Sequence, residues 1–168
     1  MASLTDRCST CGLEPRTVNP PDAVAALHSY PRRYRALLVR PDDKEGADIV
    51  RRRPEGGGWS ALEHAAHATE VIDLVAEAVH AVRVRDHPDV EIEPGTPRAG
   101  TVDEVVESLA ARTEGLASLV GQLSGEDWKR TGALGGGETV TLLDLVRHAV
   151  HVGAHHRREV ERVLREVR

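Results

Sequence analysis

Phenylalanine is absent from this chain, and Trp and Tyr supply only two residues each, so the core is expected to be aliphatic. Two cysteines are too few for a disulfide scaffold, and we expect them to be reduced. No apolar run approaches the about 20 residues that span a bilayer. The N-terminus has no hydrophobic signal segment. We therefore expect a cytoplasmic protein with no membrane partner.

The charge pattern excludes a second class of partner. The formal net charge is −5, and basic residues do not gather into the clustered face that nucleic-acid binding requires. With 40% apolar and 29% charged residues, the composition does not match that of a disordered chain. A length of 168 residues suits one domain, residues 1–168, that buries its own core.

Apolar residues recur at steps of three and four in four segments, which is typical of helices. Ser60, Thr101 and Thr141 each precede an acidic residue by three positions, the pattern of a helix capping box. Pro31 is expected to kink or split the first helix. After a tail of residues 1–20, the predicted helices are residues 22–40, 60–85, 101–123 and 141–167.

Long loops join these helices, at 41–58 and at 88–100, which favours at least one crossover connection. Residues 135–137 are three glycines and are expected to form a flexible link before a short extended piece at 139–140. The sequence therefore predicts an all-α four-helix bundle. Bundles of this kind place metals between facing helices.

The last predicted helix is unusually rich in histidine. His148, His151, His155 and His156 are four of the nine histidines in the chain, and they fall within nine residues. His156 lies on the apolar stripe, whereas His151 and His155 are one turn apart on another face. Two histidines at this spacing can present ring nitrogens to one divalent metal. Surface and core histidines without a metal are the alternative.

Two further pairs can complete a metal site. Cys8 and Cys11 form a Cys-x-x-Cys turn that can chelate zinc or act as a redox pair. The short polar segment before it and the prolines after it disfavour redox function, which leaves zinc or an unligated tail. His64 and His67 lie at the start of the second helix, within reach of a metal held by the last one. We expect His64 to be half-exposed, with orientation of the metal environment as its alternative role.

Several of these motifs resemble those of one known family. The segments are WSALEHAAH at 59–67, DWKRTG at 127–132 and HVGAHH at 151–156. In this order they resemble the DinB-like proteins, which include mycothiol-dependent maleylpyruvate isomerases and related thiol S-transferases. The opening Cys-x-x-Cys-Gly is similar to that of an actinobacterial branch. The resemblance implies an up-down-down-up four-helix bundle that binds a divalent metal, usually zinc or nickel.

The resemblance also implies which residues bind the metal, and at one of these positions the sequence departs from the family pattern. His67 corresponds to the family ligand on the second helix, and His156 corresponds to the later ligand on the last helix. The earlier ligand position, four residues before, is Val152, which cannot bind a metal and where Asp is expected in this branch. His67 and His156 are therefore two of three expected ligands.

Two arrangements follow, and both stay open at this point. In one, Cys8, Cys11, His151 and His155 form a closed zinc site that holds the tail to the last helix. In the other, His151 and His155 join His67 in a three-histidine site with an open position. The first arrangement suits structural zinc and the second suits catalysis.

The functional expectations divide in the same way. The resemblance implies a metal-dependent thiol S-transferase or isomerase that uses mycothiol or a similar small thiol as co-substrate and an electrophile as substrate. The alternative is a non-catalytic, zinc-stabilised bundle that binds a ligand or partner. A homodimer is compatible with either.

Overall fold

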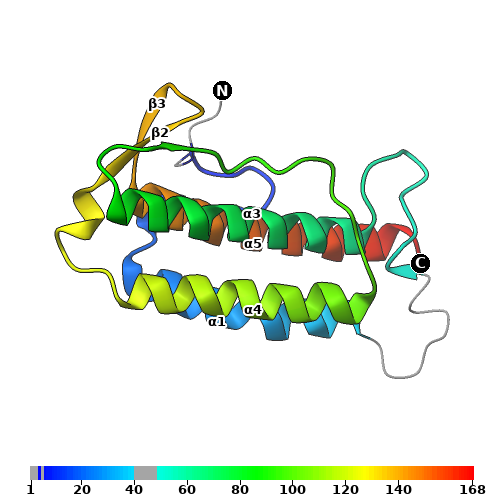
Figure 1. The fold of residues 1–168 in the computed structure, drawn as a ribbon. Helices are drawn as coiled ribbons and strands as arrows, with labels where there is room; N and C mark the ends of the chain where they lie inside the picture. Colours follow the sequence, from blue (N-terminus) through cyan, green and yellow to red (C-terminus); the bar gives the residue numbers. More distant parts are fainter. Residues whose placement is uncertain (1–3, 5, 40–48) are drawn as a thin grey trace.

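The computed structural model describes Leu4 and residues 6–39 and 49–168. Four long helices dominate the fold (Figure 1): α1 (Pro20–Leu38), α3 (Ala61–Val84), α4 (Val102–Gly121) and α5 (Leu142–Glu166). The predicted helices at 60–85, 101–123 and 141–167 agree with them to within two residues at each end. The first begins two residues earlier than predicted, and predicted residue 40, like the loop at 41–48, lies outside the described residues.

The helices form an up-down-down-up bundle (Figure 1). α1 and α5 run one way, and α3 and α4 run the other way. α3 packs against α5 and α4, and α1 packs against α4 and α5. Because α3 and α4 are parallel, residues 85–101 must return along the length of the bundle as a crossover segment. The predicted four-helix bundle and its crossover are confirmed.

The predicted capping boxes begin three of these helices. In each, the hydroxyl of Ser60, Thr101 or Thr141 accepts a hydrogen bond from the backbone amide three residues later. The acidic side chain of that third residue accepts one from the amide of the capping residue. These bonds satisfy amides that a helix start leaves unpaired. Asn19 caps α1, whose first two residues are prolines.

Pro31 does not split α1, so that part of the expectation is wrong. The tyrosines on either side of it hold the helix to α5. Tyr30 donates a hydrogen bond of 2.6 Å to the Val150 carbonyl, and Tyr34 donates one of 2.9 Å to the Gly153 carbonyl. Both rings are buried, so tertiary packing outweighs the backbone hydrogen bond that proline removes.

A small sheet at one end of the bundle was missed by the sequence prediction. β1 (Asp89–Val90) pairs in parallel with β2 (Thr131–Leu134), which pairs antiparallel with β3 (Glu138–Thr141). The glycines at 135–137 form the β2–β3 turn and not a flexible link. Gly135 and Gly136 have φ values of 56° and 72°, which favour glycine. Only the extended piece at 139–140 was anticipated.

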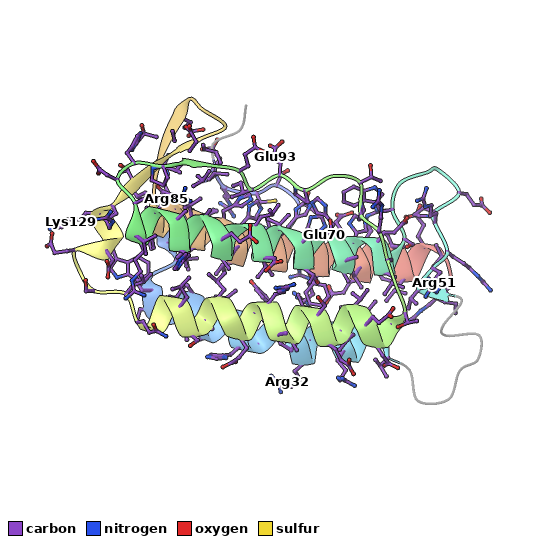
Figure 2. All side chains as sticks on the ribbon, in the orientation of Figure 1. Arg32, Arg51, Glu70, Arg85, Glu93 and Lys129 are labelled. Atoms are coloured by element: carbon purple, nitrogen blue, oxygen red, sulfur yellow. The ribbon has the colours of Figure 1, made fainter. Side chains whose placement is uncertain are left out.

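Two single-turn 3₁₀ helices complete the fold, η1 (Pro15–Thr17) before α1 and η2 (Asp127–Lys129) before β2. The core is aliphatic, as expected, and includes fully buried Leu27, Ile72 and Leu109. Charged side chains such as those of Arg32 and Lys129 project outward (Figure 2). Within the described residues, no helix is both long and apolar enough to span a bilayer.

Candidate metal centre

The two cysteines lie in a tight turn of the N-terminal segment. The Gly12 amide donates to the Cys8 carbonyl at 2.9 Å, and the Cys8 amide donates to the Leu13 carbonyl at 3.0 Å. Gly12 has a φ of 74°, a conformation that glycine adopts without strain. The turn therefore holds both thiols in a fixed local geometry.

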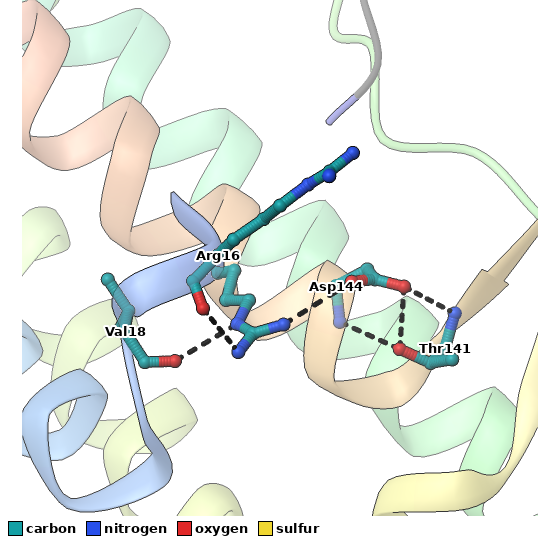
Figure 3. Close-up of polar contacts among 5 residues, drawn as sticks. Arg16, Val18, Thr141 and Asp144 are labelled. Atoms are coloured by element: carbon teal, nitrogen blue, oxygen red, sulfur yellow. Dashed lines mark hydrogen bonds and ion pairs between the residues drawn. The ribbon is translucent and has the colours of Figure 1, made fainter. Parts of the chain in front are cut away.

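Arg147 of α5 anchors the same segment (Figure 3). Its guanidinium donates to the carbonyls of Val18 at 3.0 Å and Arg16 at 2.8 Å. Asp144 lies 3.8 Å from this guanidinium and also completes the cap with Thr141. The tail is thus fixed to the first half of α5, on the approach to the histidines of that helix.

Cys8, Cys11, His151 and His155, here called the Cys–His cluster, come together across the tail and α5. One ligand atom from each lies within 4.8 Å of all the others. The Cys8 Sγ lies 3.4 Å from the His155 Nδ1. Around tetrahedral zinc, neighbouring sulfur and nitrogen ligands lie roughly 3.4 to 3.8 Å apart, from bond lengths of about 2.0–2.3 Å. The donor set and its spacing fit zinc after a small contraction.

The charges of the cluster favour a cation. Burial alone would raise the pKa of Cys8, but hydrogen bonds from the Cys11 backbone and from the His151 and His155 rings lower it to about 5. Burial raises the pKa of Cys11, and the neighbouring Cys8 thiolate raises it further. Two adjacent thiolates are costly together unless a cation lies between them. A bound metal would remove that cost.

One nitrogen in the cluster also needs a partner. The Nε2 of His151 is buried and has no hydrogen-bond partner among the described residues. A buried polar atom without a partner is destabilising. Coordination of a metal by this nitrogen would satisfy it.

The other predicted ligands lie in a separate group. Trp59, His64, His67 and His156, here called the imidazole cluster, pack where α3 begins against α5. The rings of His67 and His156 are 4.7 Å apart, and Trp59 lies 4.6 Å from the ring of His67. His64 is only 8% exposed, so the expectation that it is half-exposed is wrong.

A hydrogen bond links two rings of the imidazole cluster. The Nδ1 atoms of His64 and His156 are 3.0 Å apart, so one ring donates and the other accepts. Burial lowers the pKa of His64 to about 4 and that of His156 to about 2, which keeps both rings neutral at pH 7. Because this bond occupies both Nδ1 atoms, only the Nε2 atoms remain as donors for a metal.

The geometry separates the two arrangements that the sequence left open. Among the described residues, the one group of three or more close ligand atoms is the Cys–His cluster, and His67 is not part of it. Val152 is 7% exposed and apolar, so it adds no ligand beside His156. The two clusters nevertheless adjoin, since the rings of His155 and His156 are 5.0 Å apart.

His148 was not singled out as a ligand, and it belongs to neither cluster. Its ring lies 6.3 Å from that of His151, and its Nδ1 is buried without a partner among the described residues. Burial lowers its pKa to about 4. His148 borders a hollow beneath the β2–β3 hairpin, and no sequence signal predicted that hairpin.

Comparison with known proteins identifies the family to which this helical bundle belongs. Residues 26–160 match the model of the DinB superfamily, so the chain belongs to that superfamily. Among solved structures it is similar to YfiT from Bacillus subtilis, described as a probable metal-dependent hydrolase with an unusual four-helix bundle topology. The TM-score is 0.72 at 14% identity, over 87% of this chain and 86% of that one, which shows a shared fold. No curated protein matches the sequence significantly.

Proposed function

We propose that this protein is a zinc-binding DinB bundle in which Cys8, Cys11, His151 and His155 hold one structural zinc ion. The observation that carries the proposal is the convergence of four zinc-type donors within 4.8 Å. Two thiolates and two imidazoles are a common donor set of structural zinc sites. The lowered pKa of Cys8 supports a thiolate ligand at neutral pH.

The proposed zinc fixes the N-terminal segment to α5. All four ligands come from the protein, which leaves no open position for a substrate, so this zinc stabilises the fold and takes no part in catalysis. The tail supplies two ligands and α5 supplies the other two. The function favoured by this geometry is that of a non-catalytic, zinc-stabilised module, and the hollow that His148 borders gives it room for a small ligand.

A second candidate function is a metal-dependent thiol S-transferase or isomerase. It is favoured by the imidazole cluster, because the resemblance implies that His67 and His156 are metal ligands and their rings are 4.7 Å apart. A divalent metal there would lower the pKa of a thiol such as mycothiol for attack on an electrophile. Val152 opposes that function because it offers no donor beside His156, whereas the hydrogen bond to His64 leaves the Nε2 of His156 available.

Elemental analysis of protein purified without added metal or chelator tests the proposal. We expect one zinc per chain in the wild type and in His67→Ala, and none in Cys8→Ser. We also expect no conjugation of mycothiol to an electrophile such as maleylpyruvate. Retention of zinc by Cys8→Ser together with its loss from His67→Ala would instead move the metal to the imidazole cluster and favour the transferase.

A further inference from the structure

A hollow of about 470 Å³ lies beneath the β2–β3 hairpin. The crossover segment, the hairpin, His148 on one side of α5 and Leu4 of the N-terminal segment line it, and we call it the hairpin hollow. Ile92 and Leu134 give it apolar walls, and Gly135 and Gly137 leave its hairpin side open. Its volume falls within the range of small-molecule sites, about 300–1,000 Å³.

Among the described residues that line the hairpin hollow, the charged ones are Glu91, Glu93 and Glu138, and none is Lys or Arg. Within the described part of the chain, none of the three carboxylates has an ion-pair partner. Glu138 also borders a second hollow that contains Arg16 and Arg147, whereas Glu91 and Glu93, both exposed, do not line that second hollow.

His148 forms the wall on the α5 side. Its ring presents an aromatic surface to the hollow. Its neighbour on the other side is His151 of the Cys–His cluster, with ring centroids 6.3 Å apart. The apolar part of a ligand in the hollow would therefore be separated from the proposed zinc ligand His151 by the ring of His148.

We propose that the hairpin hollow binds an organic ammonium ion, with its apolar body against Ile92, Leu134 and the His148 ring and its charge at Glu91 and Glu93. The acidic rim attracts a cation and repels carboxylates and phosphates. The apolar walls select an ammonium that carries a hydrocarbon arm over an inorganic cation. This inference rests on the ligand-binding role proposed above, and it names the chemical class of the ligand.

Three probes of similar shape and different charge test the charge preference on the wild-type protein. Isothermal titration and amide chemical shifts are measured with 2-phenylethylammonium, 2-phenylethanol and phenylacetate, at low salt and pH 7. We expect the ammonium to bind and to shift the amides of Gly135 and Gly137. The alcohol should bind about fivefold more weakly and the carboxylate at least about tenfold more weakly. Equal binding of all three, or no binding of the ammonium, overturns the proposal.

A double variant tests the assigned carboxylates. Glu91→Gln/Glu93→Gln should weaken ammonium binding at least about fivefold. The exposed residues Glu77 on α3 and Glu107 on α4 give a control of equal charge change, and Glu77→Gln/Glu107→Gln should leave the affinity unchanged. Equal loss in both variants would mean nonspecific attraction to an acidic protein and would contradict the site. Zinc content is measured on each sample, so a protein that keeps its zinc and ignores the ammonium refutes this inference alone.

Discussion

The Cys–His cluster and the imidazole cluster draw on the same turns of α5, yet they are built in opposite ways. The first combines two thiols with two histidines, and one of its buried ring nitrogens lacks a partner. The second is closed on itself, since His64 and His156 share a hydrogen bond and Trp59 packs against the rings. Adjacent residues, His155 and His156, therefore have different chemical roles.

The difference shows that the role of each histidine on a histidine-rich helix depends on the element that packs against it. A tail that offers thiols completes a group of four possible metal ligands on one face of α5. A helix that offers an imidazole and an indole turns the next face into a neutral buried network. The spacing of the histidines along α5 does not distinguish the two clusters. They differ in the element that packs against α5, which is the tail for one and α3 for the other.

Loss of one thiol should have the largest effect on this contrast. Cys8→Ser should remove the zinc and lower the melting temperature, because structural zinc contributes about 10 kcal/mol or more of apparent binding energy. The helices should still form, since most of the buried core residues belong to the four helices themselves. Circular dichroism and zinc analysis measure both effects. Ser9→Ala, in the same turn, is the matched control and should retain zinc and stability.

An acidic residue at position 152, where the resemblance to DinB-like proteins implies a ligand, should allow the imidazole cluster to bind a metal. Val152→Asp places a carboxylate four residues before His156, and we expect it to bind a second equivalent of metal. Without metal the buried carboxylate should destabilise the fold by a few kcal/mol, and added zinc should restore stability. Val152→Ala controls for the lost methyl groups. A Val152→Asp protein that still binds one metal, with or without excess zinc, would contradict the assignment of this position.

A third change tests the contact between α1 and α5 near the two clusters. A methyl group at Gly153 would collide with the Tyr30 ring, so Gly153→Ala should separate α1 from α5. Overpacking of this kind costs about 1–3 kcal/mol, measured by urea denaturation. Both clusters use α5 residues next to Gly153, so zinc affinity should fall as well. Gly115→Ala, at a helical position with open space, should be neutral or stabilising; equal destabilisation by both changes would refute the contact.

Acid should act mainly on the buried imidazoles. Folding lowers the pKa of His64 and His148 from 6.5 to about 4, so between these values the unfolded chain binds more protons. The stability that each contributes is complete above pH 6.5 and is lost as the pH falls toward 4, by up to about 1.4 kcal/mol per pH unit. Urea midpoints of chelator-treated protein from pH 7 to pH 4 measure this slope. His148→Gln should flatten it, whereas a change at exposed His80 should not.

Much of the fold was predictable because its signals are local. Three capping boxes and the apolar periodicity located the starts of α3, α4 and α5 to within a residue or two. The β1–β2–β3 sheet was not predictable, because β1 has only two residues and β2 contains glycine. The stability of the sheet therefore depends on contacts distant in sequence. The continuity of α1 through Pro31 likewise depends on tyrosine hydrogen bonds to α5.

The candidate site was also predictable only where its signals are local in sequence. The ligand types and the pairing of Cys8 and Cys11 with His151 and His155 were one of two arrangements that sequence spacing allowed. Spacing within a helix identifies the face of each histidine, but it does not say which element covers that face. The burial of His64 and the hollow beside His148 therefore required the packed structure.

X-ray absorption at the zinc edge of the untreated protein tests the central claim most directly. The account predicts one zinc per chain with two sulfur ligands at about 2.3 Å and two nitrogen ligands at about 2.0–2.1 Å. A coordination shell of nitrogen and oxygen alone, with no sulfur, would contradict it.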